Sequence, residues 1–336
     1  MVAAFFHIAK RWMNTVVLKK ILNWGIVSTG QIAEKFCTDM PYVNNATVTA
    51  VAARKLEDAT QFAVKHKIKN AYQGYQALFD DPEIDVIYVA TPHNFHFQHV
   101  KDALTAGKHV LCEKPITISS DEFKALSSLA KKNKLFLMEA MWTYFLPSVL
   151  KAKEWVDQGR IGTIKHIKAE FGYLVPYEPE RRMYNPNLAG GCLLDMGIYP
   201  LAIAQYFNSG QLNEVVIKSH FAPHKVDDDL VLLATCNEVT LSLATSFQCR
   251  LQNSALIVGD KGYIEIPNFW RAKSCALYQL DEKTDEYHDS HLGSGLHHEA
   301  REVSDAILKD KIEHSIMPHS TSLLLQQQLE DIRALF

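Results

Sequence analysis

Apolar and polar residues alternate in regular blocks along the first 140 residues of the chain. Short apolar or β-branched runs predict buried strands at 21–27, 47–53, 84–90, 108–112 and 135–139. The intervening segments have the apolar spacing of amphipathic helices, at 31–40, 56–66, 95–106 and 119–131. Strands that alternate with helices of this length need crossover connections, so we predict a parallel sheet with helices on both faces.

From about residue 143 the pattern changes. Strands joined by short turns are predicted at 163–172, 214–220, 230–236, 240–248, 255–258 and 263–266, and helices at 148–158, 296–308 and 320–335. Short turns between strands favour a largely antiparallel sheet. The predicted fold class is therefore an α/β Rossmann-type parallel-sheet domain, residues 21–142, followed by an α+β domain with a large, mostly antiparallel open sheet, residues 143–336.

Composition and the N-terminus narrow the class of protein. A chain of 336 residues exceeds one compact core. Lys+Arg 35 against Asp+Glu 38 gives no reason to expect a nucleic-acid or membrane partner, and no apolar segment reaches the ~20 residues of a membrane span. The charges at 10–11 follow the apolar run 2–9, so a secretory signal fits poorly. We interpret residues 1–20 as a disordered or loosely docked tail, with 1–12 as an extension upstream of Met13.

The distribution of cysteines suggests the cellular compartment of the protein. Six cysteines are scattered through the chain with no Cys-x-x-Cys pair. Scattered single cysteines are typical of buried free thiols in a reducing environment. We therefore expect a cytoplasmic protein.

An incomplete glycine fingerprint follows the first predicted strand. Ser28-Thr29-Gly30-Gln31-Ile32-Ala33 keeps the middle glycine and a small third residue, while serine replaces the first glycine. Alone this match is weak, but it lies between a strand and a helix. A helix N-terminus offers free N–H groups and a positive dipole end to a phosphate. We expect a dinucleotide cofactor here.

The end of the second strand indicates which dinucleotide is bound. An NAD-binding chain would carry an acid there for the ribose 2′-hydroxyl, but the sequence reads Arg54-Lys55, with no acid until Glu57. Arginine can bind a 2′-phosphate bidentately. We predict a preference for NADP(H), with NAD(H) as the alternative cofactor and a solvated helix entry as the alternative role of the two cations.

A second group of candidate cofactor contacts follows the strand at 84–90. Thr91-Pro92-His93 ends that strand, and a nicotinamide ribose contact or a simple strand-to-helix turn would both fit. His93, His96 and His99 are three residues apart, a spacing that could also hold a metal. Zinc sites usually add cysteine or carboxylate ligands, so we expect no metal and interpret His93 and His96 as bordering the cofactor crevice.

Glu113-Lys114-Pro115 ends the strand at 108–112, at the mouth of the predicted crevice. A lysine in that place can be a catalytic group, and Asp195 and Tyr199 in the segment 195–199 could be its partners. Each residue also has a structural alternative: Lys114 can pair with Glu113, Asp195 can cap a helix, and Tyr199 can pack in a core.

Five motifs together resemble one family. They are Gly25-Ile26-Val27-Ser28-Thr29-Gly30, Ala90-Thr91-Pro92-His93, Glu113-Lys114-Pro115, Met138-Glu139-Ala140-Met141-Trp142, and Gly190-Gly191 followed by Leu194-Asp195-Met196-Gly197-Ile198-Tyr199. In this order and spacing the chain resembles the Gfo/Idh/MocA oxidoreductases. It is most similar to the branch that holds dimeric dihydrodiol dehydrogenases and NADP-linked D-xylose dehydrogenases.

The resemblance implies an NADP-dependent dehydrogenase acting on the CH–OH group of a sugar, cyclitol or cyclic diol. It implies a cis peptide before Pro115, Lys114, Tyr199 and Asp195 as catalytic residues, and a homodimer or homotetramer formed through the C-terminal sheet. The expected cofactor contacts are Ser28, Thr29, Gly30, Gln31, Ile32, Arg54, Lys55, Thr91, Pro92, His93, His96, Glu113, Lys114 and Trp142.

One residue differs from the usual sequence of this branch at a position that bears on the substrate. The branch usually has arginine two residues after the tryptophan, whereas this chain has Tyr144 there, so we expect an arginine contact near the site to be missing. Two alternatives to the dehydrogenase are a dinucleotide-binding sensor without turnover and an NAD-assisted glycoside hydrolase. Sensors are expected to lose the lysine or its partner. Retention of Lys114, Asp195 and Tyr199 favours an enzyme.

Overall fold

A computed structural model describes residues 21–336, so the predicted N-terminal tail lies outside the described residues. The first half forms a parallel six-stranded sheet in the order β3-β2-β1-β4-β5-β6. Its strands are β1 (Leu22–Val27), β2 (Ala46–Ala53), β3 (Asn70–Gln73), β4 (Val86–Val89), β5 (His109–Glu113) and β6 (Leu137–Ala140). The order reverses between β1 and β4. In doubly wound sheets, ligands bind at such a switch point, beyond the carboxyl ends of the strands.

Helices connect these strands, and all but the short α3 are predicted by the periodicity. They are α1 (Gln31–Asp39), α2 (Leu56–His66), α3 (Gln76–Phe79), α4 (His96–Thr105) and α5 (Ser120–Asn133). Gly25 in β1 shows how tightly the sheet and its cover are packed. A Cβ at Gly25 would come within 2.8 Å of Leu78 Cδ1 and 3.1 Å of Ile87 Cδ1, so only glycine fits there without repacking.

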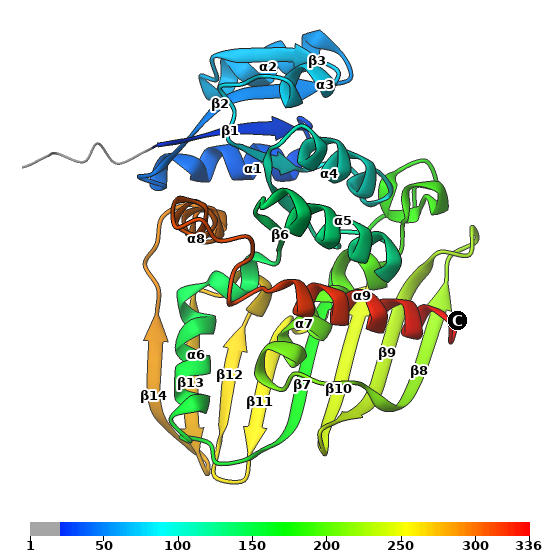
Figure 1. Cartoon of the computed structure of the whole chain (residues 1–336). Coiled ribbons are helices and arrows are strands. Elements are labelled where there is room, and N and C mark those ends of the chain that lie inside the picture. The colour runs from blue at the N-terminus through cyan, green and yellow to red at the C-terminus, as the bar shows by residue number, and fades with distance from the viewer. Residues whose placement is uncertain (1–20) are drawn as a thin grey trace, which may run out of the picture.

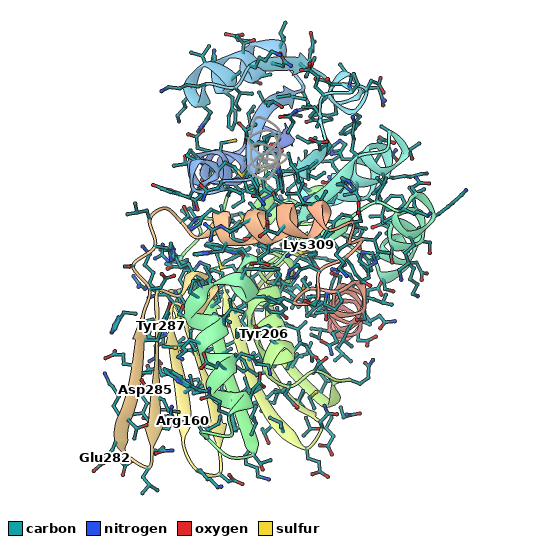
Figure 2. The ribbon with its side chains drawn as sticks, turned by 60° about the vertical axis from the view of Figure 1, so that its left-hand side comes forward. Arg160, Tyr206, Glu282, Asp285, Tyr287 and Lys309 are labelled. Atoms are coloured by element: carbon teal, nitrogen blue, oxygen red, sulfur yellow. The ribbon has the colours of Figure 1, made fainter. Side chains whose placement is uncertain are left out.

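The second half forms an eight-stranded sheet in the order β14-β13-β12-β11-β7-β10-β9-β8, antiparallel except where β7 meets β10. The strands are β7 (Ile164–Gly172), β8 (Asn213–Phe221), β9 (Asp227–Cys236), β10 (Val239–Ser246), β11 (Ser254–Gly259), β12 (Tyr263–Pro267), β13 (Ser274–Gln279) and β14 (Glu282–His288). The Arg160–Asp285 ion pair (Nη1–Oδ2 3.2 Å) ties the segment after α6 (Pro147–Asp157) to edge strand β14 (Figure 2).

Helices cover one face of this second sheet, and the last two helices join the halves of the molecule (Figure 1). Helices α6 and α7 (Ile198–Phe207) pack on the sheet, α8 (Leu296–Leu308) packs on α1, and α9 (His319–Arg333) packs on α5 and β6. His319 bridges the halves directly, since its ring nitrogens lie 3.0 Å from Ser127 Oγ and 2.9 Å from Leu137 O. Helices α8 and α9 therefore hold the two halves together.

The structure confirms the predicted fold class and extends the strand count. The sequence patterns missed β3, β13, β14 and the short helix α3. They also missed α7, which is apolar on all sides because it is buried in the second core. The segment Pro186–Phe207 is apolar and long enough to cross a membrane by composition, but 72% of its most apolar window is buried inside the fold. Core packing accounts for its hydropathy.

Candidate active site

A tight turn between β1 and α1 forms one end of the crevice. Ser28 adopts φ +108°, a backbone region that L-residues rarely enter and glycine tolerates. Its hydroxyl accepts a hydrogen bond from the Gly30 amide at 3.1 Å, which fixes the turn. A Cβ at Gly30 would meet only Ser28 Oγ, at 3.4 Å, so the space before the helix is open. The turn and helix N-terminus fit a pyrophosphate.

Opposite charges lie at the end of β2. Arg54 lines the crevice together with Tyr75, as expected of a cofactor contact, whereas Lys55 is not among the residues that line it. Lys55 is the N-cap of α2, and its side chain is exposed. Asp58, in the first turn of α2, also lines the crevice, so the acid missing from the strand end is supplied one turn later.

The segment after β4 supplies Thr91, Pro92 and His93 to the crevice. His93 is buried, and burial, reinforced by the nearby Arg182 guanidinium, lowers its pKa well below the usual value, so its imidazole is neutral. His96 does not line the crevice. Its ring nitrogens lie 2.8 Å from Pro115 O and 2.7 Å from Thr91 O, so it braces the turns after β4 and β5 from behind.

Lys114 lies at the end of β5, and the peptide bond that follows it, Lys114–Pro115, is cis, as the resemblance implies. Its ammonium donates to the Asp195 backbone oxygen at 2.5 Å and lies 4.6 Å from the centre of the Tyr199 ring. Burial lowers the pKa of Lys114, and the Asp195 and Glu113 charges partly oppose that effect. The adjacent Glu113 accepts a hydrogen bond from the buried Tyr88 hydroxyl.

Asp195 belongs to a π-helical turn, Leu193–Gly197, directly before α7. π-Turns are rare and frequent at functional sites. Burial alone would raise the pKa of the Asp195 carboxyl, but the Lys114 and Arg182 charges outweigh burial and lower that pKa to about 2. Arg182 Nη2 lies 2.7 Å from Asp195 Oδ1, so the carboxylate is ionised and held in place.

One glycine and a buried acid support this turn. Gly191 has φ +129°, and a Cβ there would overlap the Asp227 carboxylate at 2.2 Å. Asp227 Oδ2 accepts the Leu193 amide at 2.7 Å. Asp227 is thus buried, and it supports the turn that carries Asp195.

Tyr199, one turn further along in α7, presents its hydroxyl to Trp142. Trp142 Nε1 donates to Tyr199 Oη at 3.0 Å. Burial, reinforced by Glu113, raises the pKa of Tyr199 well above the usual value, so the phenol is protonated in the resting site. Because Trp142 donates to the phenol oxygen, the phenol's own proton is free to point toward a bound molecule.

Sequence reasoning missed Arg182. It comes from a short 3-10 turn, Arg182–Tyr184, in an irregular segment with no periodic pattern. Besides Asp195, it contacts His93, with Nη1 3.2 Å from the ring Nε2. The expectation of a missing arginine was therefore wrong for the site as a whole, although Tyr144 itself is buried and donates to Ala202 O at 2.6 Å.

Lys114, Asp195 and Tyr199 line one continuous cavity of about 1350 Å³ together with the turn after β1. Ser28 to Ile32 and Arg54 lie in the first half, and Lys114, Asp195 and Tyr199 lie where the halves meet. Phe171 and Trp270 form an aromatic wall on the second-domain side, with ring centres 4.3 Å apart. The cavity is large enough for a dinucleotide and a small molecule together. Its chemistry suits transfer at a carbon–oxygen bond, because a cation and a phenol share one buried position.

Comparison with known proteins agrees with this geometry. Residues 22–141 match the family model described as an oxidoreductase family with an NAD-binding Rossmann fold, and residues 149–265 match the GFO/IDH/MocA C-terminal domain. The fold and site define a nicotinamide-dependent oxidoreductase that acts on CH–OH groups. The chain belongs to the Gfo/Idh/MocA family.

Curated relatives are trans-1,2-dihydrobenzene-1,2-diol dehydrogenases. The one from Danio rerio is 34% identical over 322 residues, covering 93% of this chain and 96% of the relative; the one from Homo sapiens is 35% identical over 326 residues, with the same coverage.

Solved structures share the fold. An aldose-aldose oxidoreductase from Caulobacter crescentus has a TM-score of 0.85 at 21% identity, covering 94% of this chain and 97% of that one. A 3-ketoreductase from Actinomadura kijaniata, solved with NADP and TDP-benzene, has a TM-score of 0.84 at 24% identity, covering 94% and 98%.

Proposed function

We propose that the chain is an NADP(H)-dependent dehydrogenase of a small cyclic diol, with sugars and cyclitols as weaker substrates. The observation that carries the proposal is the convergence of Lys114, Asp195 and Tyr199 on the cavity that begins at the β1–α1 turn. Bound NADP(H) would supply hydride exchange at its nicotinamide ring. The dinucleotide would be held by the turn at Ser28–Ile32, Arg54 and the segment Thr91–His93.

The side chains of the protein stabilise the charge on the substrate oxygen and transfer its proton. Lys114 Nζ stabilises negative charge that develops on that oxygen, since a buried ammonium acts strongly in a water-poor site. In the reducing direction Tyr199 Oη gives its proton to the oxygen; in the oxidising direction the same atom receives it. Arg182 and the Asp195 carboxylate hold each other, and the Asp195 backbone oxygen orients the ammonium.

Lys114→Ala tests the catalytic assignment. We expect turnover to fall at least about a thousandfold, since the cation that stabilises the developing oxyanion is lost, while NADPH affinity, measured by fluorescence titration, changes by less than about threefold. Lys101→Ala, on the exposed side of α4, serves as the control. Undiminished turnover in Lys114→Ala contradicts the assignment.

The cofactor preference rests on charge at the end of β2. Arg54 supplies a guanidinium to the crevice, and Asp58 supplies a nearby carboxylate that would repel a 2′-phosphate. We expect Arg54→Gln to lower kcat/KM for NADPH by about tenfold relative to NADH, as one charged hydrogen bond is lost. Asp58→Asn should shift the ratio the opposite way. A wild-type enzyme that prefers NADH refutes the preference.

The aromatic wall of the cavity favours a cyclic substrate. Phe171 and Trp270 offer a flat apolar surface to a cyclic carbon skeleton, and Arg182 offers donors to its hydroxyl groups. The curated relatives are named for a cyclic diol, which favours this class. We expect NADP+ reduction to be fastest with trans-dihydrodiols in a panel with pentoses, hexoses and inositols. Tight dinucleotide binding with no turnover across the panel would instead indicate a sensor.

The uncovered face of the second sheet supports a homodimer or homotetramer. Val216, Val231 and Leu233 are exposed on β8 and β9, and Val216 pairs directly with Leu233 across the two strands. Exposed apolar side chains on an open sheet favour burial against a second copy. Leu233→Lys should shift the mass measured by light scattering toward the monomer. An unchanged mass contradicts an interface at this position.

A cytoplasmic location is supported by the cysteines, since all six lie in the described part of the chain and are unpaired. Cell fractionation with an antibody to the native protein tests it, and recovery in a secreted fraction contradicts it.

A further inference from the structure

A cluster of two histidines and one carboxylate lies outside the catalytic residues. Asp289 and His291 are in the loop between β14 and α8, and His298 is in the first turn of α8. Each residue offers one ligand atom, and these atoms all lie within 4.8 Å of one another. Within residues 21–336, this is the one group of three or more such side chains whose ligand atoms come that close. The side chains are largely buried, with exposed fractions of 10%, 6% and 14%.

Two ring nitrogens of this cluster have no hydrogen-bond partner. Asp289 accepts from the His291 amide at 3.0 Å and contacts the His291 ring through Nδ1. His298 Nε2 lies 4.0 Å from Asp289 Oδ2, too far for a hydrogen bond. His291 Nε2 and His298 Nε2 are buried and have no hydrogen-bond partner. Two orphaned ring nitrogens beside one carboxylate call for a ligand, because buried polar atoms are normally paired.

The distances suit a metal ion. Two ligands of a tetrahedral zinc ion with bonds of about 2.0 Å lie about 3.3 Å apart. The His298 Nε2–Asp289 Oδ2 separation is 4.0 Å and all candidate ligand atoms lie within 4.8 Å of one another, so side-chain rotations can bring them to that spacing. Imidazole with carboxylate matches zinc and its first-row neighbours, whereas calcium and magnesium prefer oxygen ligands.

The loop around the cluster is held rigidly. The Asp39 carboxylate, from α1, accepts the amides of Ser294, Gly295 and Leu296, each at 2.9 Å. The Asp289 amide donates to Lys273 O at 2.7 Å, which fixes the other end. The three ligand candidates are therefore positioned before any ion arrives, and preorganisation of this kind lowers the cost of binding.

We propose that Asp289, His291 and His298 bind one zinc-class divalent ion, with water completing the coordination. The site is structural and lies apart from the Lys114 chemistry. It is adjacent to the crevice all the same, because Gly293, Ser294 and Leu296 line that cavity. Occupancy would tie the β14–α8 loop to α8 and steady the cavity wall formed by this loop.

The test uses the full-length, tag-free protein after dialysis against a chelator. Zinc titration by calorimetry should give one ion per chain, and cobalt substitution should give the absorption of a four-coordinate site with nitrogen and oxygen ligands. His291→Gln and His298→Gln should each weaken zinc binding at least about tenfold, since each removes one of three protein ligands. His288→Gln is the matched control, because His288 lies on the exposed end of β14 and pairs with Glu286.

A second readout separates binding from misfolding. Zinc should raise the melting temperature of the wild type and of His288→Gln, but not of His298→Gln. Should a histidine variant fail to fold by circular dichroism, Asp289→Asn replaces it, and its cobalt spectrum should be lost. Absence of stoichiometric binding in the wild type overturns the proposal, as does equal zinc affinity in the wild type and all ligand variants.

Discussion

Replacing Asp195 with asparagine removes one charge from the centre of the site and keeps the side-chain shape. The folded-state pKa of about 2, against an ordinary 3.8, corresponds to roughly 2 kcal/mol of stabilisation of the ionised carboxylate. In Asp195→Asn, Lys114 and Arg182 lose that counter-charge, while the backbone oxygen that accepts from Lys114 remains. We expect kcat/KM to fall by about 30-fold, the rate equivalent of roughly 2 kcal/mol.

The pH dependence of Asp195→Asn tests the electrostatic reasoning. Burial lowers the pKa of Lys114 and Asp195 opposes that effect, so loss of the carboxylate lowers the pKa further. The alkaline limb of kcat/KM should therefore move to lower pH. The free energy of unfolding also depends on the Asp195 pKa. Because this pKa is depressed in the fold, the carboxylate stabilises the fold above pH 3.8, and this contribution is lost as pH falls toward 2. The variant should be less stable at pH 7 by up to roughly 2 kcal/mol, with the difference shrinking in acid.

Asp285→Asn is the control for this experiment. It breaks another Asp–Arg pair, in which Arg160 of the segment after α6 contacts Asp285 of β14 (Figure 2). Both side chains are partly exposed, and surface pairs of this kind contribute about 0–1 kcal/mol. Chemical denaturation and pH profiles of kcat/KM measure both variants. An unchanged alkaline limb in Asp195→Asn, or an equal loss of activity in Asp285→Asn, refutes the reasoning.

Three further predictions follow from buried groups. Tyr199→Phe should lower kcat at least about a hundredfold with little change in cofactor KM, because the proton-carrying hydroxyl is lost; steady-state kinetics measures this. Burial raises the pKa of Glu139 to about 7, so the fold loses stability between pH 4.5 and 7, and Glu139→Gln should raise the unfolding free energy more at pH 8 than at pH 5. Gly25→Ala should lower that free energy by about 1–3 kcal/mol in urea, since its Cβ would press on Leu78. Equal stabilisation by Glu139→Gln at both pH values, or a Gly25→Ala protein as stable as the wild type, contradicts these accounts.

Edge strands show where hydrophobic periodicity no longer predicts secondary structure. The strand β14 reads Glu-Lys-Thr-Asp-Glu-Tyr-His, a polar run without alternation, and its extended shape depends on pairing with β13. The helix α7 has the opposite problem, because it is apolar all round and carries no amphipathic signal. Elements with one buried and one exposed face, such as α2, were predictable because burial imposes the pattern.

The candidate site divides in the same way. The sequence alone determined the alternating strands and helices, the β1–α1 turn and the position of Lys114, since parallel strands all end at one edge and local patterns mark those ends. Only the tertiary structure joined Arg182 to Asp195, buried Tyr144 and His96, and gathered Asp289, His291 and His298. Those contacts join loops, turns and helix ends, whose neighbours are set by packing of the whole chain and leave no period in the sequence.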